Sequence, residues 1–174
     1  MKLTVNDLNS FYGPAHILFD IALEVGEGEV VALLGRNGAG KSTTFRSIVG
    51  LVENRSGRIV FEGKDVSHEP THAIVRSGLG YVPEERRIFT DLTVEENLEV
   101  GRQPKRPGAP QWDRDKLFKL FPNLGEMRGR PGGRMSGGEQ QMLTIARTLM
   151  GNPDRKSTRL NSSHESVSRM PSSA

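Results

Sequence analysis

The sequence contains no cysteine, no long hydrophobic run and few aromatic residues (6%) in 174 positions. Without cysteine there are no disulfides, thiolate zinc sites or cysteine nucleophiles, and this composition is typical of a reducing compartment. No segment approaches the ~20 apolar residues of a membrane-spanning helix, and the first residues lack the apolar core of a secretory signal. The 34% hydrophobic content is typical of one water-soluble domain with its own core.

Positive charge is concentrated at one end of the chain. The net charge is +3, and residues 155–174 carry four basic side chains against Glu165, so this segment holds the whole excess. The remainder is electrically balanced, which argues against a nucleic-acid partner. Residues 155–174 are also serine-rich and lack apolar periodicity, so we expect them to be disordered and to be a non-native tail.

Strand and helix patterns alternate through residues 1–154, which predicts an α/β fold. Alternating or β-branched runs predict strands at 2–8, 17–25, 58–62 and 79–82. The unbroken run Val30–Leu34 is typical of a strand buried on both faces of a parallel sheet. Helices are predicted at 41–49, 93–100, 113–121 and 137–150, and residues 125–134, rich in glycine and arginine, are expected to form a mobile loop.

The segment 35–42, GRNGAGKS, follows the predicted buried strand and precedes a predicted helix. It matches the pattern G-x-x-x-x-G-K-[ST] of phosphate-binding loops. Glycines at 35, 38 and 40 allow main-chain N–H groups to approach a polyanion closely. Lys41 can reach the β- and γ-phosphates of a nucleotide, and the Ser42 hydroxyl is the expected Mg²⁺ ligand.

A second glycine-containing motif, MSGGEQQ at 135–141, opens the last predicted helix. Ser136 and Glu139 have the spacing of a capping box, so the motif has a purely structural explanation. Gly137 and Gly138 would also leave main-chain N–H groups exposed at a helix N-terminus, which favours an anion. Both interpretations are compatible with the sequence.

The two motifs together resemble the Walker A and LSGGQ signature of ATP-binding-cassette (ABC) ATPases. The resemblance implies a P-loop NTPase fold with a RecA-like core, an antiparallel β subdomain and a helical subdomain at about 85–150. It implies that ATP and Mg²⁺ are bound, and that Tyr12 stacks on the adenine. The implied nucleotide-binding residues are Tyr12, Gly35, Arg36, Asn37, Gly38, Ala39, Gly40, Lys41, Ser42, Thr43, Ser136, Gly137, Gly138 and Glu139.

The segment YVPEERRIFTDLTVEENL at 81–98 resembles the shorter ATPase subunit of branched-chain amino-acid importers. Glu84 stands where most relatives have glutamine, in the loop that contacts Mg²⁺ and the membrane subunit. The resemblance therefore implies catalytic roles for Lys41 and Glu84, and a metal site that includes Ser42 and Glu84. Importers of urea or amides, and ABC ATPases that do not act in transport, are the alternatives.

The resemblance also implies partners and a location. Two ATPase subunits, identical or different, would clamp two ATP molecules head to tail. Transmembrane permease subunits would carry the cargo, and a periplasmic amino-acid-binding protein would deliver it. The ATPase would lie peripherally on the cytoplasmic face of the bacterial inner membrane.

One part of the ABC pattern is missing from this sequence. The family places an apolar strand ending in Asp-Glu soon after the signature helix, and no such strand follows residue 140 here. We therefore expect residues 1–154 to be a C-terminally incomplete ABC domain. We also expect this chain to bind ATP without hydrolysing it, whereas the intact parent would be an ATPase.

Overall fold

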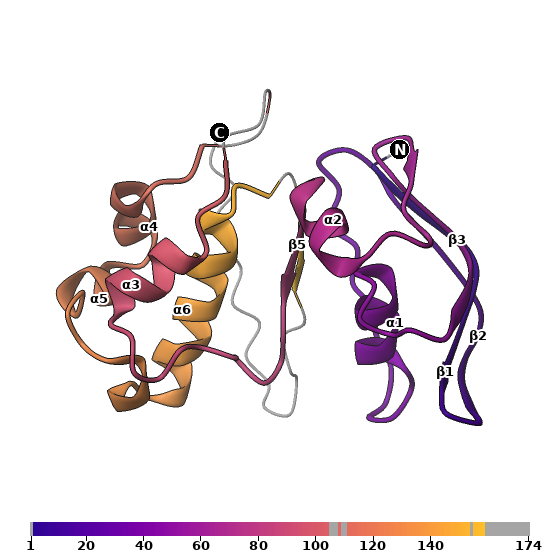
Figure 1. Cartoon of the computed structure of the whole chain (residues 1–174), viewed down its shortest axis with the longest axis horizontal. Helices are drawn as coiled ribbons and strands as arrows, with labels where there is room; N and C mark the ends of the chain where they lie inside the picture. Colours follow the sequence, from indigo (N-terminus) through magenta and orange to yellow (C-terminus); the bar gives the residue numbers. More distant parts are fainter. Residues whose placement is uncertain (1, 105–107, 109–110, 154, 159–174) are drawn as a thin grey trace.

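An antiparallel sheet forms one face of the molecule in the computed structural model, which describes residues 2–104, 108, 111–153 and 155–158 (Figure 1). Its central strands are β1 (Leu3–Tyr12) and β3 (Arg55–Phe61), with β2 (Ala15–Val25) on one edge and β4 (Lys64–Asp65) on the other. Strands β1 and β2 form a hairpin whose turn contains Gly13 at φ 55°, a left-handed conformation that glycine adopts without steric cost.

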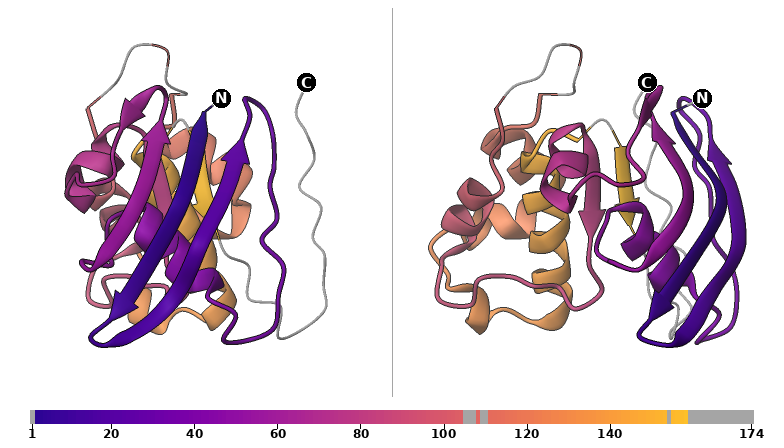
Figure 2. Two further views of the ribbon diagram at one scale, coloured as in Figure 1. Left: turned by 90° about the vertical axis from the view of Figure 1, so that its right-hand side faces the viewer. Right: turned by 45° about the vertical axis from the view of Figure 1, so that its right-hand side comes forward.

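The inner face of this sheet packs on helix α1 (Lys41–Ile48) (Figure 2). Leu3, Val5 and Leu8 of β1 are buried, as alternation along a half-buried strand predicts. The buried hydroxyls of Ser10 and Ser47 are 2.7 Å apart and hydrogen-bond the sheet to the helix. The sheet therefore fixes the helix that follows the glycine loop.

A second core lies among the helices of the other half of the molecule (Figure 1). These are α3 (Val94–Val100), α4 (Arg114–Leu120), α5 (Pro122–Glu126) and α6 (Gly137–Met150). Both α3 and α6 begin with complete capping boxes, in which the N-cap hydroxyl and the N3 glutamate satisfy each other's main-chain N–H groups. The buried side chain of Asn97 bonds to the main chain of Phe89, Leu92 and Thr93, so it anchors the entry to α3.

Helix α2 (Thr71–Arg76) and strand β5 (Leu79–Val82) lie between α1 and α6 (Figure 1), and their residues Ile74 and Leu79 belong to the first core. Strand β6 (Arg155–Thr158) pairs with β5 in parallel. The expectation of disorder was therefore wrong for residues 155–158, since strand pairing uses main-chain groups that every side-chain composition offers. Residues 159–174 lie outside the described residues.

The expected strand at Val30–Leu34 was also wrong. Residues 29–36 have no regular secondary structure, and the side chains of Val30 and Leu34 are 93% and 87% exposed. A strand of this kind requires a hydrogen-bonding neighbour on each side, and among the described residues none pairs with this segment.

The glycine- and arginine-rich segment 125–134 is more ordered than expected. It contains the end of α5 and a 3₁₀ turn, η1 (Gly132–Arg134). The carbonyls of Arg128 and Arg130 accept hydrogen bonds from the N–H groups of Glu95 and Val94, so the segment is tied to the first turn of α3. The expected loop is thus partly helical, because tertiary hydrogen bonds compensate for its flexible composition.

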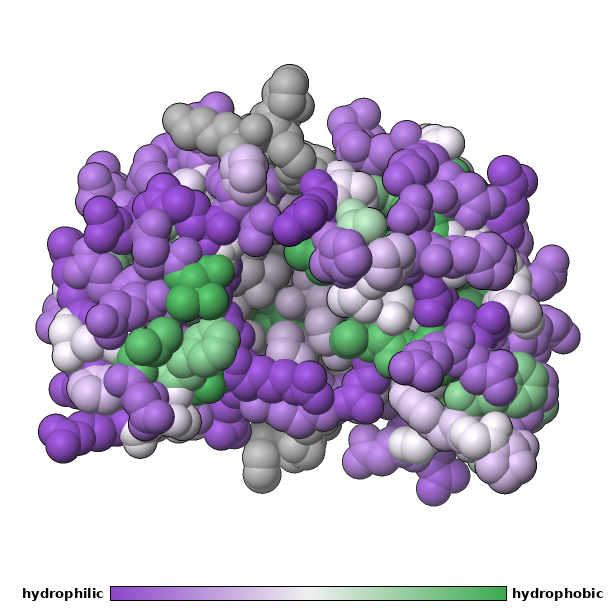
Figure 3. Space-filling view, in the orientation of Figure 1, coloured by the Kyte–Doolittle hydropathy of each residue, from purple (hydrophilic) through white to green (hydrophobic). Residues whose placement is uncertain are grey.

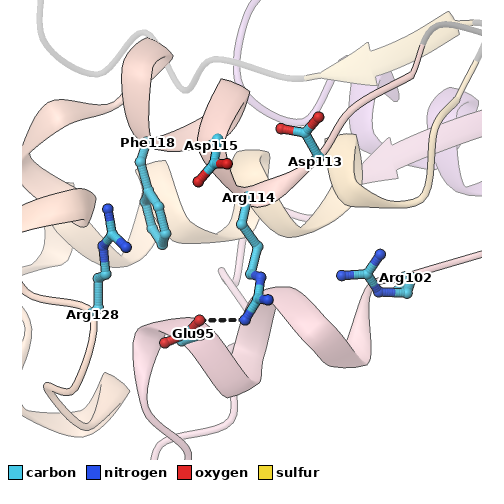
Figure 4. Close-up of a pocket in the computed structure, with 7 residues that line it drawn as sticks. All are labelled: Glu95, Arg102, Asp113, Arg114, Asp115, Phe118 and Arg128. Atoms are coloured by element: carbon cyan, nitrogen blue, oxygen red, sulfur yellow. Dashed lines mark hydrogen bonds and ion pairs between the residues drawn. The ribbon is translucent and has the colours of Figure 1, made fainter.

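Charged side chains join the helices on the outer side of this half. Arg114 of α4 forms an ion pair with Glu95 of α3 beside a hollow that is also lined by Arg102 and Arg128 (Figure 4). Arg128 lies 4.3 Å above the ring of Phe118. None of the helices in the described part of the chain has the length and hydropathy needed to cross a bilayer.

Candidate functional site

The glycine loop leads directly into the N-terminus of α1. Gly35, Gly38 and Gly40 all have positive φ angles, of 156°, 84° and 85°. A Cβ on Gly40 would lie 2.7 Å from the side chain of Leu18, whereas one on Gly38 would meet nothing within 4 Å. At φ 85° a side chain on Gly40 would be strained and would also displace the end of the Leu18 side chain on β2, while Gly38 borders open space. Residues 35–39 are exposed, as a loop that wraps a ligand must be.

Helix α1 has no side-chain cap at its N-terminus. Gly40 is the N-cap residue, and the first helical hydrogen bond runs from Thr44 N–H to the Gly40 carbonyl at 2.8 Å. The first turn of the helix contains no acidic residue of its own. A helix N-terminus behind a glycine loop is well suited to bind phosphate.

The ammonium group of Lys41 lies inside its own loop. Nζ donates hydrogen bonds to the carbonyls of Gly35 and Arg36 at 2.6 and 2.7 Å. These bonds fold the loop around the lysine and hold its positive charge within the loop. A phosphate oxygen is a better acceptor than a carbonyl for an ammonium ion, so an arriving polyphosphate can replace either contact.

Ser42 and Glu84 meet although 42 positions separate them. Ser42 Oγ donates a 2.6 Å hydrogen bond to Glu84 Oε1, and both side chains are partly buried. Two oxygen donors side by side suit Mg²⁺, which prefers oxygen ligands. Within the described residues, no group of three or more histidine, aspartate or glutamate side chains is placed to hold a metal. Ser42 and Glu84 therefore fit Mg²⁺ that is also held by phosphate oxygens.

Tyr12 lies close to the same helix, beside Arg46. It is 45% exposed at the end of β1. Hydrogen bonds to the side chains of Tyr12 and then Tyr81 raise the pKa of Arg46, with a further contribution from the charge of Glu85. Arg46 forms an ion pair with Glu85. Arg46 thus connects the exposed tyrosine to the segment that carries Glu84.

The SGGE motif forms the N-terminus of α6. Ser136 N–H donates to Glu139 Oε2 at 2.6 Å, and Glu139 N–H donates to Ser136 Oγ at 3.3 Å. The main-chain bond from Ser136 is the main cause of a lowered Glu139 pKa. A Cβ on Gly137 would lie 3.2 Å from both terminal nitrogens of Arg86, so this guanidinium lies against the motif. The structural role expected for the capping box is present.

The predicted site residues fall into two groups. Gly35, Lys41, Ser42 and Glu84 lie at the N-terminal end of α1, together with the rest of residues 35–43. Residues 136–139 lie at the N-terminus of α6, on the other side of β5 (Figures 1 and 2). Within one copy of the chain, the two motifs do not form one site.

Thr144 and Arg147 of α6 contact the Glu84 segment and were not singled out by sequence. Thr144 Oγ1 donates to the Arg86 carbonyl and Arg147 Nη2 donates to the Arg87 carbonyl, both at 2.6 Å. Burial lowers the pKa of Arg147. Their spacing on one helix face is ordinary in the sequence, so no local signal distinguishes them.

A largely apolar groove of about 340 Å³ lies between α2, β5 and α6. Val75, Phe89 and Val100 line it and are 37%, 47% and 53% exposed. Figure 3 shows the molecule hollowed between its two halves, with hydrophobic residues on both sides of the hollow. This groove adjoins the segment that follows Glu84.

The chain is similar in sequence to a known protein family and to characterised proteins. The family model described as ABC transporter matches residues 18–155. The chain is 43% identical to BraG of Pseudomonas aeruginosa, a high-affinity branched-chain amino acid transport ATP-binding protein, over 87% of this chain and 65% of that one. It is 41% identical to LptB of Haemophilus influenzae, a lipopolysaccharide export system ATP-binding protein, over 87% and 64%. The chain thus spans 64–65% of the length of these relatives.

Several solved structures have a fold similar to that of this chain. An ATP-binding subunit of an ABC transporter superposes with a TM-score of 0.71 at 30% identity, covering 88% of this chain and 63% of that one. A bacterial Atm1-family ABC exporter with ATP bound gives a TM-score of 0.72 at 31% identity, covering 89% and 28%. The fold is the expected P-loop NTPase fold of ABC ATPases. Together with the family match, this shows that the chain belongs to the ABC transporter family.

Proposed function

We propose that this chain is the nucleotide-binding part of an ATP-hydrolysing subunit that powers branched-chain amino-acid import. The observation that carries the proposal is the arrangement at the start of α1, where Lys41 lies in an open glycine loop and Ser42 contacts Glu84. The 43% identity to BraG supports the cargo class. Hydrolysis is assigned to the whole protein, whereas this chain binds ATP.

The groups around the glycine loop have separate proposed roles. Main-chain N–H groups of residues 35–43 surround the phosphates, and Lys41 neutralises their charge. Ser42 and Glu84 hold Mg²⁺ from the protein side, where the metal would neutralise charge on the β- and γ-phosphates. Tyr12 supplies an aromatic face for the adenine, and Arg46 holds its hydroxyl end.

A second ATPase subunit, identical or different, is a further part of the proposal. The N-termini of α1 and α6 lie in different halves of the chain (Figure 1). A second copy arranged head to tail can bring its own Ser136, Gly137 and Gly138 to the phosphates held by the first. Two such nests of N–H groups would enclose one triphosphate from both sides.

Membrane permease subunits are the other proposed partners. The apolar groove lined by Val75, Phe89 and Val100 adjoins the Glu84 segment and supports this assignment. A permease segment in the groove would place the protein peripherally at the cytoplasmic face of the bacterial inner membrane. A periplasmic amino-acid-binding protein would act only through the permease. We also propose that residues 1–154 form the ABC domain, with its helical subdomain at about 85–150.

A second candidate function is lipopolysaccharide export, because the identity to LptB is 41% over a similar span. The nucleotide site would be the same, and only the membrane partner would differ. Binding of the chain to detergent-solubilised membrane subunits of each transporter class separates the two. Binding to the export subunits alone would overturn the amino-acid assignment.

The test of nucleotide binding is isothermal titration of the 174-residue chain with ATP and Mg²⁺. We expect saturable binding that Lys41→Ala weakens at least tenfold, an effect of roughly 1.4 kcal/mol or more. Lys64→Ala is the matched control, because Lys64 is an exposed lysine on β4 that pairs with Glu69. Equal affinities for the wild type and Lys41→Ala would overturn the proposal.

A further inference from the structure

Residues 84–87 connect the helix of the glycine loop to the helix of the SGGE motif. On the α1 side, Glu84 accepts a hydrogen bond from Ser42 at 2.6 Å, and the next residue, Glu85, pairs with Arg46. The following two carbonyls, those of residues 86 and 87, accept side-chain hydrogen bonds from α6. Four consecutive residues thus contact both halves of the molecule.

The main chain of this connection is held in an unfavourable conformation. Arg86 and Arg87 have φ angles of 60° and 46°, and neither is glycine. The left-handed region is disfavoured for residues with a Cβ, and such conformations persist only where surrounding contacts enforce them. The Arg87 N–H donates a 2.6 Å hydrogen bond to the Glu85 carbonyl, so the chain turns tightly at Arg86, two residues after Glu84.

The enforcing contacts come from one face of α6. Thr144 Oγ1 donates to the Arg86 carbonyl, and Arg147 Nη2 donates to the Arg87 carbonyl, both at 2.6 Å. Arg147 also lies 5.2 Å above the ring of Phe89, which fixes its guanidinium plane. Residues three apart on a helix share a face, so both donors approach the turn from the same side.

We propose that Thr144 and Arg147 are positioning residues for Glu84, holding its carboxylate at Ser42 by clamping the turn at Arg86 and Arg87. The proposal rests on the nucleotide and Mg²⁺ site proposed above.

The test compares Thr144→Val with Thr144→Ser in the full chain. Valine keeps the shape of threonine and removes the hydroxyl, whereas serine retains the donor. ATP affinity is measured by titration with Mg²⁺ and again with the metal chelated. We expect Thr144→Val and Arg147→Met to lose about tenfold of the Mg²⁺-dependent gain in affinity, while metal-free ATP binding does not weaken, because a displaced Glu84 carboxylate repels the triphosphate less. Thr144→Ser should behave like the wild type.

A second measurement requires no nucleotide. Amide hydrogen exchange in the peptide that covers residues 84–88 should speed up in Thr144→Val and Arg147→Met, but not in Thr144→Ser. Unchanged exchange in both variants would overturn the proposed role of Thr144 and Arg147, whether or not the wild type binds ATP. Failure of the wild type to bind ATP would instead count against the proposed function. Faster exchange with an unaltered Mg²⁺ effect would overturn the positioning role, because a purely structural contact predicts that combination.

Discussion

The hydroxyl of Ser42 donates a 2.6 Å hydrogen bond to the carboxylate of Glu84, joining the first turn of α1 to the end of β5. The resemblance to ABC ATPases implies a glutamine at this position in most relatives. A carboxylate is a stronger acceptor than an amide oxygen and brings a negative charge close to the phosphate loop. We therefore expect the Glu84 carboxylate to strengthen the binding of Mg²⁺ and to weaken the binding of the triphosphate.

Replacing Glu84 with glutamine separates these effects. Glu84→Gln keeps an acceptor for Ser42 and removes the charge. We expect ATP binding without metal to strengthen roughly three- to tenfold, because repulsion of the triphosphate disappears, and the Mg²⁺-dependent gain to shrink by a similar factor. Titrations with ATP alone and with ATP and Mg²⁺ measure both. If Glu84→Gln and the wild type respond equally to Mg²⁺, Glu84 does not face the metal.

Tyr12 offers a test of base stacking. Aromatic stacking on a base contributes about 1–3 kcal/mol, which corresponds to roughly 5- to 150-fold in Kd. We expect Tyr12→Ala to weaken ATP binding within this range. Tyr12→Phe keeps the ring and removes the contact with Arg46, so it should cost less than threefold or so, about 0.6 kcal/mol. Equal losses in both variants would show that the hydroxyl, not the ring, is what matters.

The parts of the fold that sequence predicted well depend on local interactions. The capping box predicted at Ser136 requires only a residue three positions later, and it formed with its two hydrogen bonds, as did the same motif at Thr93 at the start of the helix predicted over 93–100. The glycine loop likewise encodes its own conformation, because positive φ at positions 35, 38 and 40 is cheap only for glycine. All the residues that such a signal requires lie within a segment of eight positions or fewer.

The parts that sequence missed depend on distant partners. The run Val30–Leu34 has the composition of a buried strand, but a strand forms only beside another strand. Residues 155–158 have the composition of a disordered tail, yet they pair with β5. The contact between Thr144 and the Arg86 carbonyl joins residues 58 positions apart, and no local pattern announces it.

The exposed run Val30–Leu34 predicts self-association. Val30 is 93% exposed, and neighbouring Val31 and Leu34 are exposed as well. Contiguous exposed apolar residues with high strand propensity promote association between chains. Val30→Thr keeps the branched shape and adds a hydroxyl, so it should lower the weight-average mass in sedimentation without changing stability by more than about 0.5 kcal/mol. Glu53→Gln, at an exposed site elsewhere, should leave the mass unchanged. An unchanged mass in Val30→Thr would contradict the prediction.

Acid should weaken the start of α6. Glu139 has a lowered pKa, mainly because it accepts the Ser136 main-chain hydrogen bond. A depressed carboxylate pKa contributes stability above the ordinary value of about 4.3, and that contribution is lost as the pH falls through the folded-state value. Glu139→Gln retains a capping acceptor that does not titrate. In urea titrations, the free energy of unfolding should therefore differ between Glu139→Gln and the wild type at pH 7, and the difference should shrink near pH 3. The same difference at both pH values would contradict this prediction.

The two capping boxes provide matched variants that separate structure from ligand binding. Thr93 caps α3 and Ser136 caps α6 with the same pair of hydrogen bonds, but only Ser136 belongs to the SGGE motif. We expect Thr93→Ala and Ser136→Ala to lower the free energy of unfolding by a similar amount, about 1 kcal/mol each. Exposed Ser56→Ala, which removes no cap, should stay within about 0.5 kcal/mol of the wild type.

Assembly should distinguish the two cap variants. If Ser136 and the glycines after it meet the phosphates held by another copy, ATP with Mg²⁺ should raise the sedimentation coefficient of the wild type and of Thr93→Ala. Ser136→Ala should lose most of that response, since one of the donors at the shared triphosphate is repositioned when its helix start frays. A nucleotide response that both variants lose equally would mean that general stability, and not the SGGE motif, controls assembly.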